Sequence, residues 1–86
     1  MFVILSYDIN QKRVGKVLKI CRKYLARVHR SVFEGKLTES QLKKLKGELE
    51  KVIDADTDSV CIYRLESVKY ASKEQIGVTE RISNII

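Results

Sequence analysis

The sequence predicts an α+β fold in which two helices cover one face of a four-stranded, mainly antiparallel sheet. Short runs rich in β-forming residues predict the strands, and two longer stretches with apolar residues at three- and four-residue spacing predict amphipathic helices. The chain has 86 residues, which allows a single domain over residues 1–86. A chain this short buries only about 60% of its unfolded surface, so we expect a second subunit to add stability.

The first half of the chain predicts a strand, a helix and a second strand. The run 2–7 is apolar on both faces, as in a strand that is covered on both sides of its sheet. Asn10 can cap a helix, and a second strand is expected over 28–33. The apolar face of this helix consists of Val14, Val17, Leu18, Cys21 and Leu25.

The second half predicts a helix and two further strands. Thr38 and Gln41 form a capping-box pattern at the start of the second amphipathic helix. A third strand is expected over 59–65, and a short fourth strand is expected over 68–70. The tail of residues 77–86 ends in isoleucines that such a small domain has no obvious need to bury. We expect this tail to pack on a partner or a neighbouring subunit.

The order of these elements also predicts how they are layered. Ferredoxin-like folds follow the order β-α-β-β-α-β, whereas the pattern of this sequence is better described as β-α-β-α-β-β. In either order, right-handed crossovers place both helices on one face of an antiparallel or mixed sheet. The opposite face stays substantially apolar, and a second sheet could cover it. We therefore expect a ferredoxin-like sandwich that forms a sheet-to-sheet homodimer.

Basic residues dominate the charge of the chain. Seventeen Lys and Arg against 11 Asp and Glu give a net charge of +6, which favours nucleic acid or another polyanion as a partner. No acidic residue lies between Ile9 and Phe33, whereas the second helix mixes both signs. We expect phosphates to be the main target, with little reading of bases. The predicted nucleic-acid contacts are Lys12, Arg13, Lys16, Arg27 and Arg30.

Cysteine usage and hydropathy indicate where the protein works. Cys21 and Cys61 belong to no CxxC pair or Cys/His cluster, so we expect both to be buried, reduced thiols. No run of 18 apolar residues is present, and the apolar run at the N-terminus is too short for a signal peptide. We expect a cytoplasmic protein with no membrane partner.

Asp8 is the only carboxylate in the first 33 residues, and it stands between a strand and a basic helix. By itself, an acid in that place is most often a turn or helix-terminus residue. Tyr7 and Phe33 are expected to be packed, and Ser31 to bind either phosphate, metal-bound water or its strand neighbours. His29 has a suitable pKa for acid-base chemistry, but a lone strand histidine is usually structural or solvated, so it stays outside the catalytic set.

Two motifs in this chain resemble those of the small CRISPR-associated nuclease family, whose members act in spacer acquisition beside the CRISPR integrase. In that family the first strand ends in a Tyr-Asp pair, as at Tyr7 and Asp8, and a Ser-Val-Phe-Glu segment marks the second strand, as at 31–34. The resemblance also covers chain length and element order. It implies a ferredoxin-like homodimer in which Asp8 is catalytic, lies near its symmetry mate and helps bind one divalent metal between the subunits. Mg²⁺ is commonly held by one or two carboxylates, so two Asp8 side chains would suffice for Mg²⁺ or another divalent cation.

Three functions remain open. The preferred one is a metal-dependent endonuclease that cleaves single-stranded RNA, double-stranded DNA or both, and takes part in spacer integration. The second is a non-catalytic scaffold of the same family that binds DNA and bridges integrase subunits. The third is a toxin-like RNA interferase or an RNA-binding module outside CRISPR systems.

Overall fold

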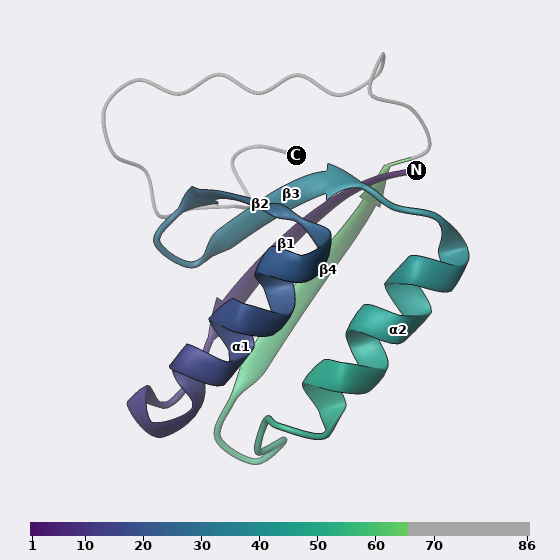
Figure 1. The fold of residues 1–86 in the computed structure, drawn as a ribbon. Coiled ribbons are helices and arrows are strands. Elements are labelled where there is room, and N and C mark those ends of the chain that lie inside the picture. The colour runs from purple at the N-terminus through teal and green to yellow at the C-terminus, as the bar shows by residue number, and fades with distance from the viewer. Residues whose placement is uncertain (66–86) are drawn as a thin grey trace.

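The computed structural model describes residues 1–65, in which two helices lie on one face of a four-stranded sheet (Figure 1). Along the sheet the strands follow the order β2-β3-β1-β4, and each neighbouring pair is antiparallel. This arrangement confirms the predicted ferredoxin-like α+β fold. The elements are β1 (Phe2–Asp8), α1 (Gln11–Tyr24), β2 (Ala26–His29), β3 (Val32–Lys36), α2 (Glu39–Glu50) and β4 (Ser59–Leu65).

A β-hairpin replaces the single strand expected over 28–33, so this prediction was wrong. Strands β2 and β3 are separated by a turn at Arg30 and Ser31, which lack the Gly or Asn that usually marks a tight hairpin. Arg27 holds the turn, because its Nη2 donates to the carbonyl oxygen of Arg30 at 2.7 Å. The fourth strand expected over 68–70 and the tail of 77–86 lie outside the described residues.

The main core lies between the helices and the sheet. Alternation along β1 directs Val3 and Leu5 into this core, where Phe33 of β3 joins them, and all three are fully buried. Apolar side chains spaced along one face of each helix complete the core, as the periodicity predicts. They are Val17 and Cys21 of α1, and Leu42, Leu45 and Leu49 of α2.

Both predicted helix starts are confirmed. The side-chain oxygen of Asn10 accepts a hydrogen bond from the backbone N–H of Lys12 at 2.9 Å. Thr38 and Gln41 form the reciprocal capping box, with Oγ1 of Thr38 accepting from Gln41 N at 3.1 Å and Oε1 of Gln41 accepting from Thr38 N at 2.9 Å. Neither of the described helices is long and apolar enough to cross a membrane.

The two cysteines differ in their surroundings. Cys21 is buried as predicted, and burial raises the pKa of its thiol to about 11. Cys61 is exposed, so its predicted burial was wrong. The reason is register, because Cys61 pairs with Ser6 on the sheet face that points away from the helices.

Candidate nucleic-acid interface and metal-binding carboxylate

Asp8 is the last residue of β1, and its side chain is exposed. It pairs with Ser59, the first residue of β4. Because Val3 and Leu5 point into the core, alternation places Asp8 on the opposite face of the sheet, with Ile4 and Ser6. We call this face, on the side away from the helices, the distal face. The carboxylate of Asp8 therefore lies at the end of a strand, where a second molecule can approach it.

One chain alone offers few ligands for a metal at this position. Among residues 1–65, no group of three or more His, Cys, Asp or Glu side chains lies close enough to hold an ion. Mg²⁺ takes oxygen ligands, and it commonly uses one or two carboxylates with water and phosphate oxygens in the remaining positions. The Asp8 carboxylate has the donor chemistry that Mg²⁺ uses.

Asp58 is a buried carboxylate close in the fold to this strand end, and sequence reasoning missed it. Its Oδ1 accepts hydrogen bonds from Asn10 N at 2.9 Å and from Arg13 Nη2 at 3.1 Å. Its Oδ2 accepts from Arg13 Nε at 2.6 Å and from Asp54 N at 2.9 Å. The Arg13 side chain, followed by the backbone N–H groups, holds the pKa of Asp58 well below its usual range. In the sequence, nothing distinguishes Asp58 from Asp54 and Asp56 in the same acidic turn.

The Arg13 guanidinium thus contacts other residues of the same chain. In addition to its two bonds to Asp58, its Nη2 lies 3.2 Å from Oγ1 of Thr57, and the side chain is only 25% exposed. The hydrogen bond to Asp58 raises the pKa of the guanidinium. Arg13 therefore joins the first turn of α1 to the loop before β4. Because its guanidinium is already paired, less of this side chain is available for the predicted contact with phosphate.

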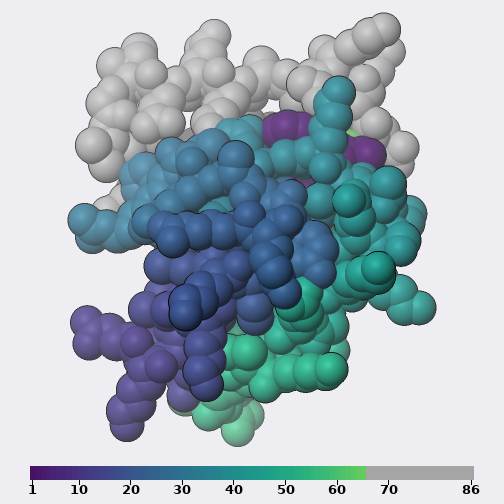
Figure 2. All heavy atoms as spheres, viewed as in Figure 1, coloured from purple at the N-terminus to yellow at the C-terminus, as the bar shows by residue number. Residues whose placement is uncertain are grey.

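The other predicted phosphate contacts are exposed. Lys12 and Lys16 lie on the solvent side of α1, and Arg27 and Arg30 lie on the hairpin. In Figure 2 the atoms of α1, in purple to blue, adjoin those of the hairpin, in lighter blue, on one side of the molecule. Four of the five predicted basic contacts are therefore exposed, two on α1 and two on the hairpin.

Tyr7 links the end of β1 to the hairpin turn. Its ring packs on Phe33 with ring centroids 6.2 Å apart, and its hydroxyl donates to the carbonyl oxygen of Arg30 at 3.4 Å. Its backbone N–H donates to the carbonyl oxygen of Ser31 at 3.1 Å. Burial raises the pKa of the phenol. Ser31 itself lies in the turn and not in a strand, and His29 is half-buried at the end of β2.

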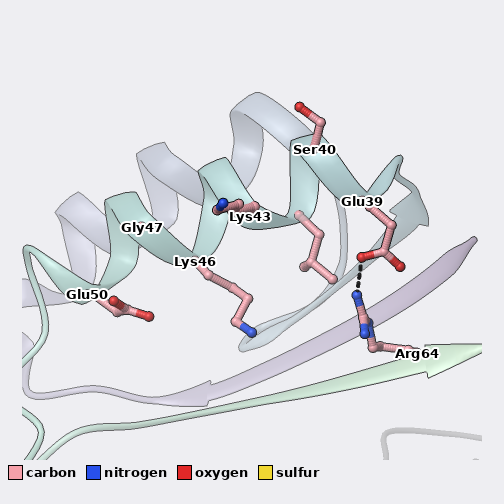
Figure 3. Close-up of a pocket in the computed structure, with 8 residues that line it drawn as sticks. Glu39, Ser40, Lys43, Lys46, Gly47, Glu50 and Arg64 are labelled. Atoms are coloured by element: carbon pink, nitrogen blue, oxygen red, sulfur yellow. Dashed lines mark hydrogen bonds and ion pairs between the residues drawn. The ribbon is translucent and has the colours of Figure 1, made fainter.

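A surface groove lies between α2 and β4, away from these residues (Figure 3). Its volume is about 570 Å³, and an ion pair between Arg64 and Glu39 crosses one end of it. Lys43, Lys46 and Glu50 also line it, so the groove carries both acidic and basic groups. The groove contains none of the residues that the sequence predicts for the functional site.

Comparison with known proteins agrees with this fold. Residues 1–73 match the family described as CRISPR associated protein Cas2. The fold is that of a small ferredoxin-like protein of the α+β class. Within that class, the sequence match identifies one family. This chain belongs to the Cas2 family of CRISPR-associated proteins.

Individual relatives cover most of the chain. The CRISPR-associated endoribonuclease Cas2 of Thermotoga maritima is 49% identical over 78 residues, which span 91% of this chain and 90% of that protein. The CRISPR-associated endoribonuclease Cas2 3 of Thermodesulfovibrio yellowstonii is 47% identical over 85 residues, covering 99% and 97% of the two chains. Among solved structures, a Cas2 crystal structure matches with a TM-score of 0.83 at 38% identity, covering 93% of this chain and 90% of the other. Streptococcus pyogenes Cas2 at pH 6.5 matches with a TM-score of 0.70 at 38% identity, covering 76% and 86%.

Proposed function

We propose that this chain is a nuclease of CRISPR adaptation that works as a homodimer in the cytoplasm. It cleaves phosphodiester bonds in single-stranded RNA, double-stranded DNA or both with the help of a divalent cation, and it takes part in spacer integration with the CRISPR integrase. The observation that carries this proposal is the position of Asp8, an exposed carboxylate at the end of β1, in a chain whose relatives are named endoribonucleases.

The distal face supports a dimer. Cross-strand pairing places Phe2 opposite Leu65, Ile4 opposite Tyr63 and Ser6 opposite Val32 on this face. Ile4 is already buried, whereas the apolar side chains of this face that are half-buried would bury further surface if two distal faces packed together. They are Phe2, Val32, Tyr63 and Leu65. The same packing would bring the Asp8 residues of the two subunits toward each other.

Different residues of the chain would bind the cation and the nucleic acid. Asp8 of each subunit would hold the cation, which when bound neutralises charge on the phosphate and lowers the pKa of an attacking water. Lys12 and Lys16 would hold phosphates along α1, and Arg27 and Arg30 would do so at the hairpin. Because the net charge of +6 per chain doubles in a dimer, the nucleic acid would be attracted over a long range at low salt.

Asp8→Asn tests the proposal, since it keeps the size of the side chain and removes its charge. We expect metal-dependent cleavage to fall by about 100-fold or more, because the cation loses its carboxylate ligands. Binding to a DNA duplex at low salt should stay at the wild-type level, as measured by fluorescence anisotropy. Asp56→Asn is the matched control, because Asp56 is also exposed and its loss changes the net charge equally. Cleavage by Asp8→Asn at the wild-type rate would contradict the proposal.

A non-catalytic scaffold that binds DNA and bridges integrase subunits is the second candidate. The observation in its favour is the exposure of Lys12, Lys16, Arg27 and Arg30, because a scaffold needs only a basic surface. Undiminished spacer acquisition by Asp8→Asn in cells would support this candidate. The family match favours both candidates over a toxin-like RNA interferase, for which growth arrest relieved by a neighbouring antitoxin would be the evidence.

A further inference from the structure

We propose that Asp58 is a positioning residue for Asp8, and that it holds the end of β1 in the geometry that metal binding requires. This inference rests on the proposed role of Asp8 as a metal ligand. Asp58 is not placed in contact with the substrate or the cation. It acts through the backbone on either side of Asp8.

The contacts of Asp58 bracket Asp8 from two directions. On one side, the Asp58 carboxylate accepts from the backbone N–H of Asn10, two residues after Asp8 along the chain. On the other side, Asp58 directly precedes Ser59, which is the cross-strand partner of Asp8. The segment that leaves β1 and the segment that enters β4 are therefore tied to the same carboxylate. Movement of either segment would displace Asp8.

The bonding of Asp58 is suited to hold a fixed geometry. Each of its two oxygens accepts two hydrogen bonds, and its side chain is fully buried. Two further ion pairs within residues 1–65, Lys23 with Glu48 and Arg64 with Glu39, have partly or largely exposed side chains. Exposed pairs exchange readily with water, whereas a buried carboxylate that loses its partners is left without solvation. The Arg13–Asp58 pair is thus held more rigidly than the Lys23–Glu48 and Arg64–Glu39 pairs, and it lies beside the proposed site.

Binding of Mn²⁺ alone provides the test, since it needs no substrate and no turnover. Free Mn²⁺ is followed by electron paramagnetic resonance in titrations of the wild type, Asp8→Asn, Asp58→Asn and Glu48→Gln. Asp58→Asn keeps the side-chain shape but removes the charge and one acceptor. Changes to groups that orient a metal ligand typically cost about 10- to 100-fold in affinity, and we expect a loss of about tenfold here. Glu48→Gln, which breaks the ion pair between Glu48 of α2 and Lys23 of α1, should bind Mn²⁺ as the wild type does.

The folded fraction of each variant, measured by circular dichroism, separates positioning from simple loss of stability. Reversible unfolding raises the apparent dissociation constant only by the reciprocal of the folded fraction and leaves the number of sites unchanged. A loss of about tenfold in a variant that is almost fully folded therefore comes from positioning, and a loss that the unfolded fraction accounts for contradicts it. Arg13→Lys is a milder variant for the case that Asp58→Asn does not fold, since it removes the guanidinium fork and keeps the bonds of Asp58 to Asn10 and Asp54. It should show a smaller loss of affinity in the same direction.

Two results would overturn the inference, and they differ in what else they overturn. If Asp8→Asn abolishes Mn²⁺ binding while the folded Asp58 and Arg13 variants bind like the wild type, only the positioning role of Asp58 fails. If the wild type and Asp8→Asn bind Mn²⁺ equally, the proposed metal site at Asp8 fails, and the role of Asp58 fails with it.

Discussion

Arg13 and Asp58 illustrate how the environment of a single residue changes its role. In the sequence, Arg13 is one of eight basic residues between Ile9 and Phe33, and it looks like a phosphate contact. In the structure it is the partner of a buried carboxylate that lies 45 residues further along the chain. A guanidinium binds a carboxylate through two parallel bonds, which fixes the relative orientation of the two segments as well as their distance.

The pH dependence of stability should reveal the Asp58 contacts. The pKa of Asp58 is lower in the folded protein than in the unfolded chain, where an aspartate has a pKa of about 3.9. Its stabilising contribution is therefore complete above about pH 4 and is lost as the pH falls through the folded pKa. We expect the urea midpoint of Asp58→Asn to lie well below that of the wild type at pH 7. The difference between the two should shrink steadily when both are measured below pH 4.

Asp56→Asn serves as the control for this series, because it removes a charge from the same loop and leaves the four bonds to Asp58 in place. Its urea midpoint should follow that of the wild type. A gap between wild type and Asp58→Asn that stays constant from pH 7 to the acid limit would show that the Asp58 charge does not stabilise the fold.

Among the elements, the β2–β3 hairpin was the least accessible to sequence reasoning. Its turn at Arg30 and Ser31 is held by side chains from other positions, namely the guanidinium of Arg27 and the hydroxyl of Tyr7. Because these contacts come from residues outside the turn, they leave little trace in the sequence of the turn itself. Helix α2, in contrast, begins at a capping box whose two residues lie three positions apart, and it was predicted correctly.

The two helices differ in charge pattern, and this difference predicts which one binds nucleic acid. We expect Lys12→Glu combined with Lys16→Glu to weaken duplex binding and to reduce its salt dependence. Each phosphate contact contributes about 0.9 to the slope of log affinity against log salt, so the loss of two contacts should lower the slope by about 2. Fluorescence anisotropy at several salt concentrations measures both quantities. Arg13 is left intact, because its replacement would also break the Asp58 contacts.

The matched control lies on and beside α2. Lys44→Glu combined with Lys51→Glu produces the same change in net charge at two exposed positions. Its salt slope should remain near that of the wild type. Equal losses of affinity and slope in both double variants would show that net charge, and not the surface of α1, governs binding.

At the scale of the whole molecule, the proposed dimer makes activity depend on two Asp8 residues together. If one site needs a carboxylate from each subunit, a dimer with one Asp8→Asn subunit should be inactive. Wild type and Asp8→Asn mixed in equal amounts, unfolded in urea and refolded together, should then retain about a quarter of the wild-type activity. Subunits that worked independently would retain about half. Refolding with Asp56→Asn in place of Asp8→Asn should leave full activity.

The sequence by itself determined the features that depend on neighbouring residues. Helix periodicity, the caps at Asn10 and Thr38, the apolar alternation of β1 and the basic surface of α1 all arise from side chains within a few positions of each other. These patterns were sufficient to predict the ferredoxin-like layering. The Tyr7-Asp8 pair and the Ser-Val-Phe-Glu segment at 31–34, together with chain length and element order, suggested the family.

Only the tertiary structure decided the features that depend on distant partners. The pairing of Arg13 with Asp58 and the exposure of Cys61 follow from which segments meet in the fold. The local sequence does not distinguish a buried carboxylate in an acidic turn from an exposed one. It likewise does not distinguish a buried cysteine in an apolar strand from an exposed one. Burial and pairing are set by strand register and by the packing of a helix on a loop, and both join residues that lie far apart in the chain.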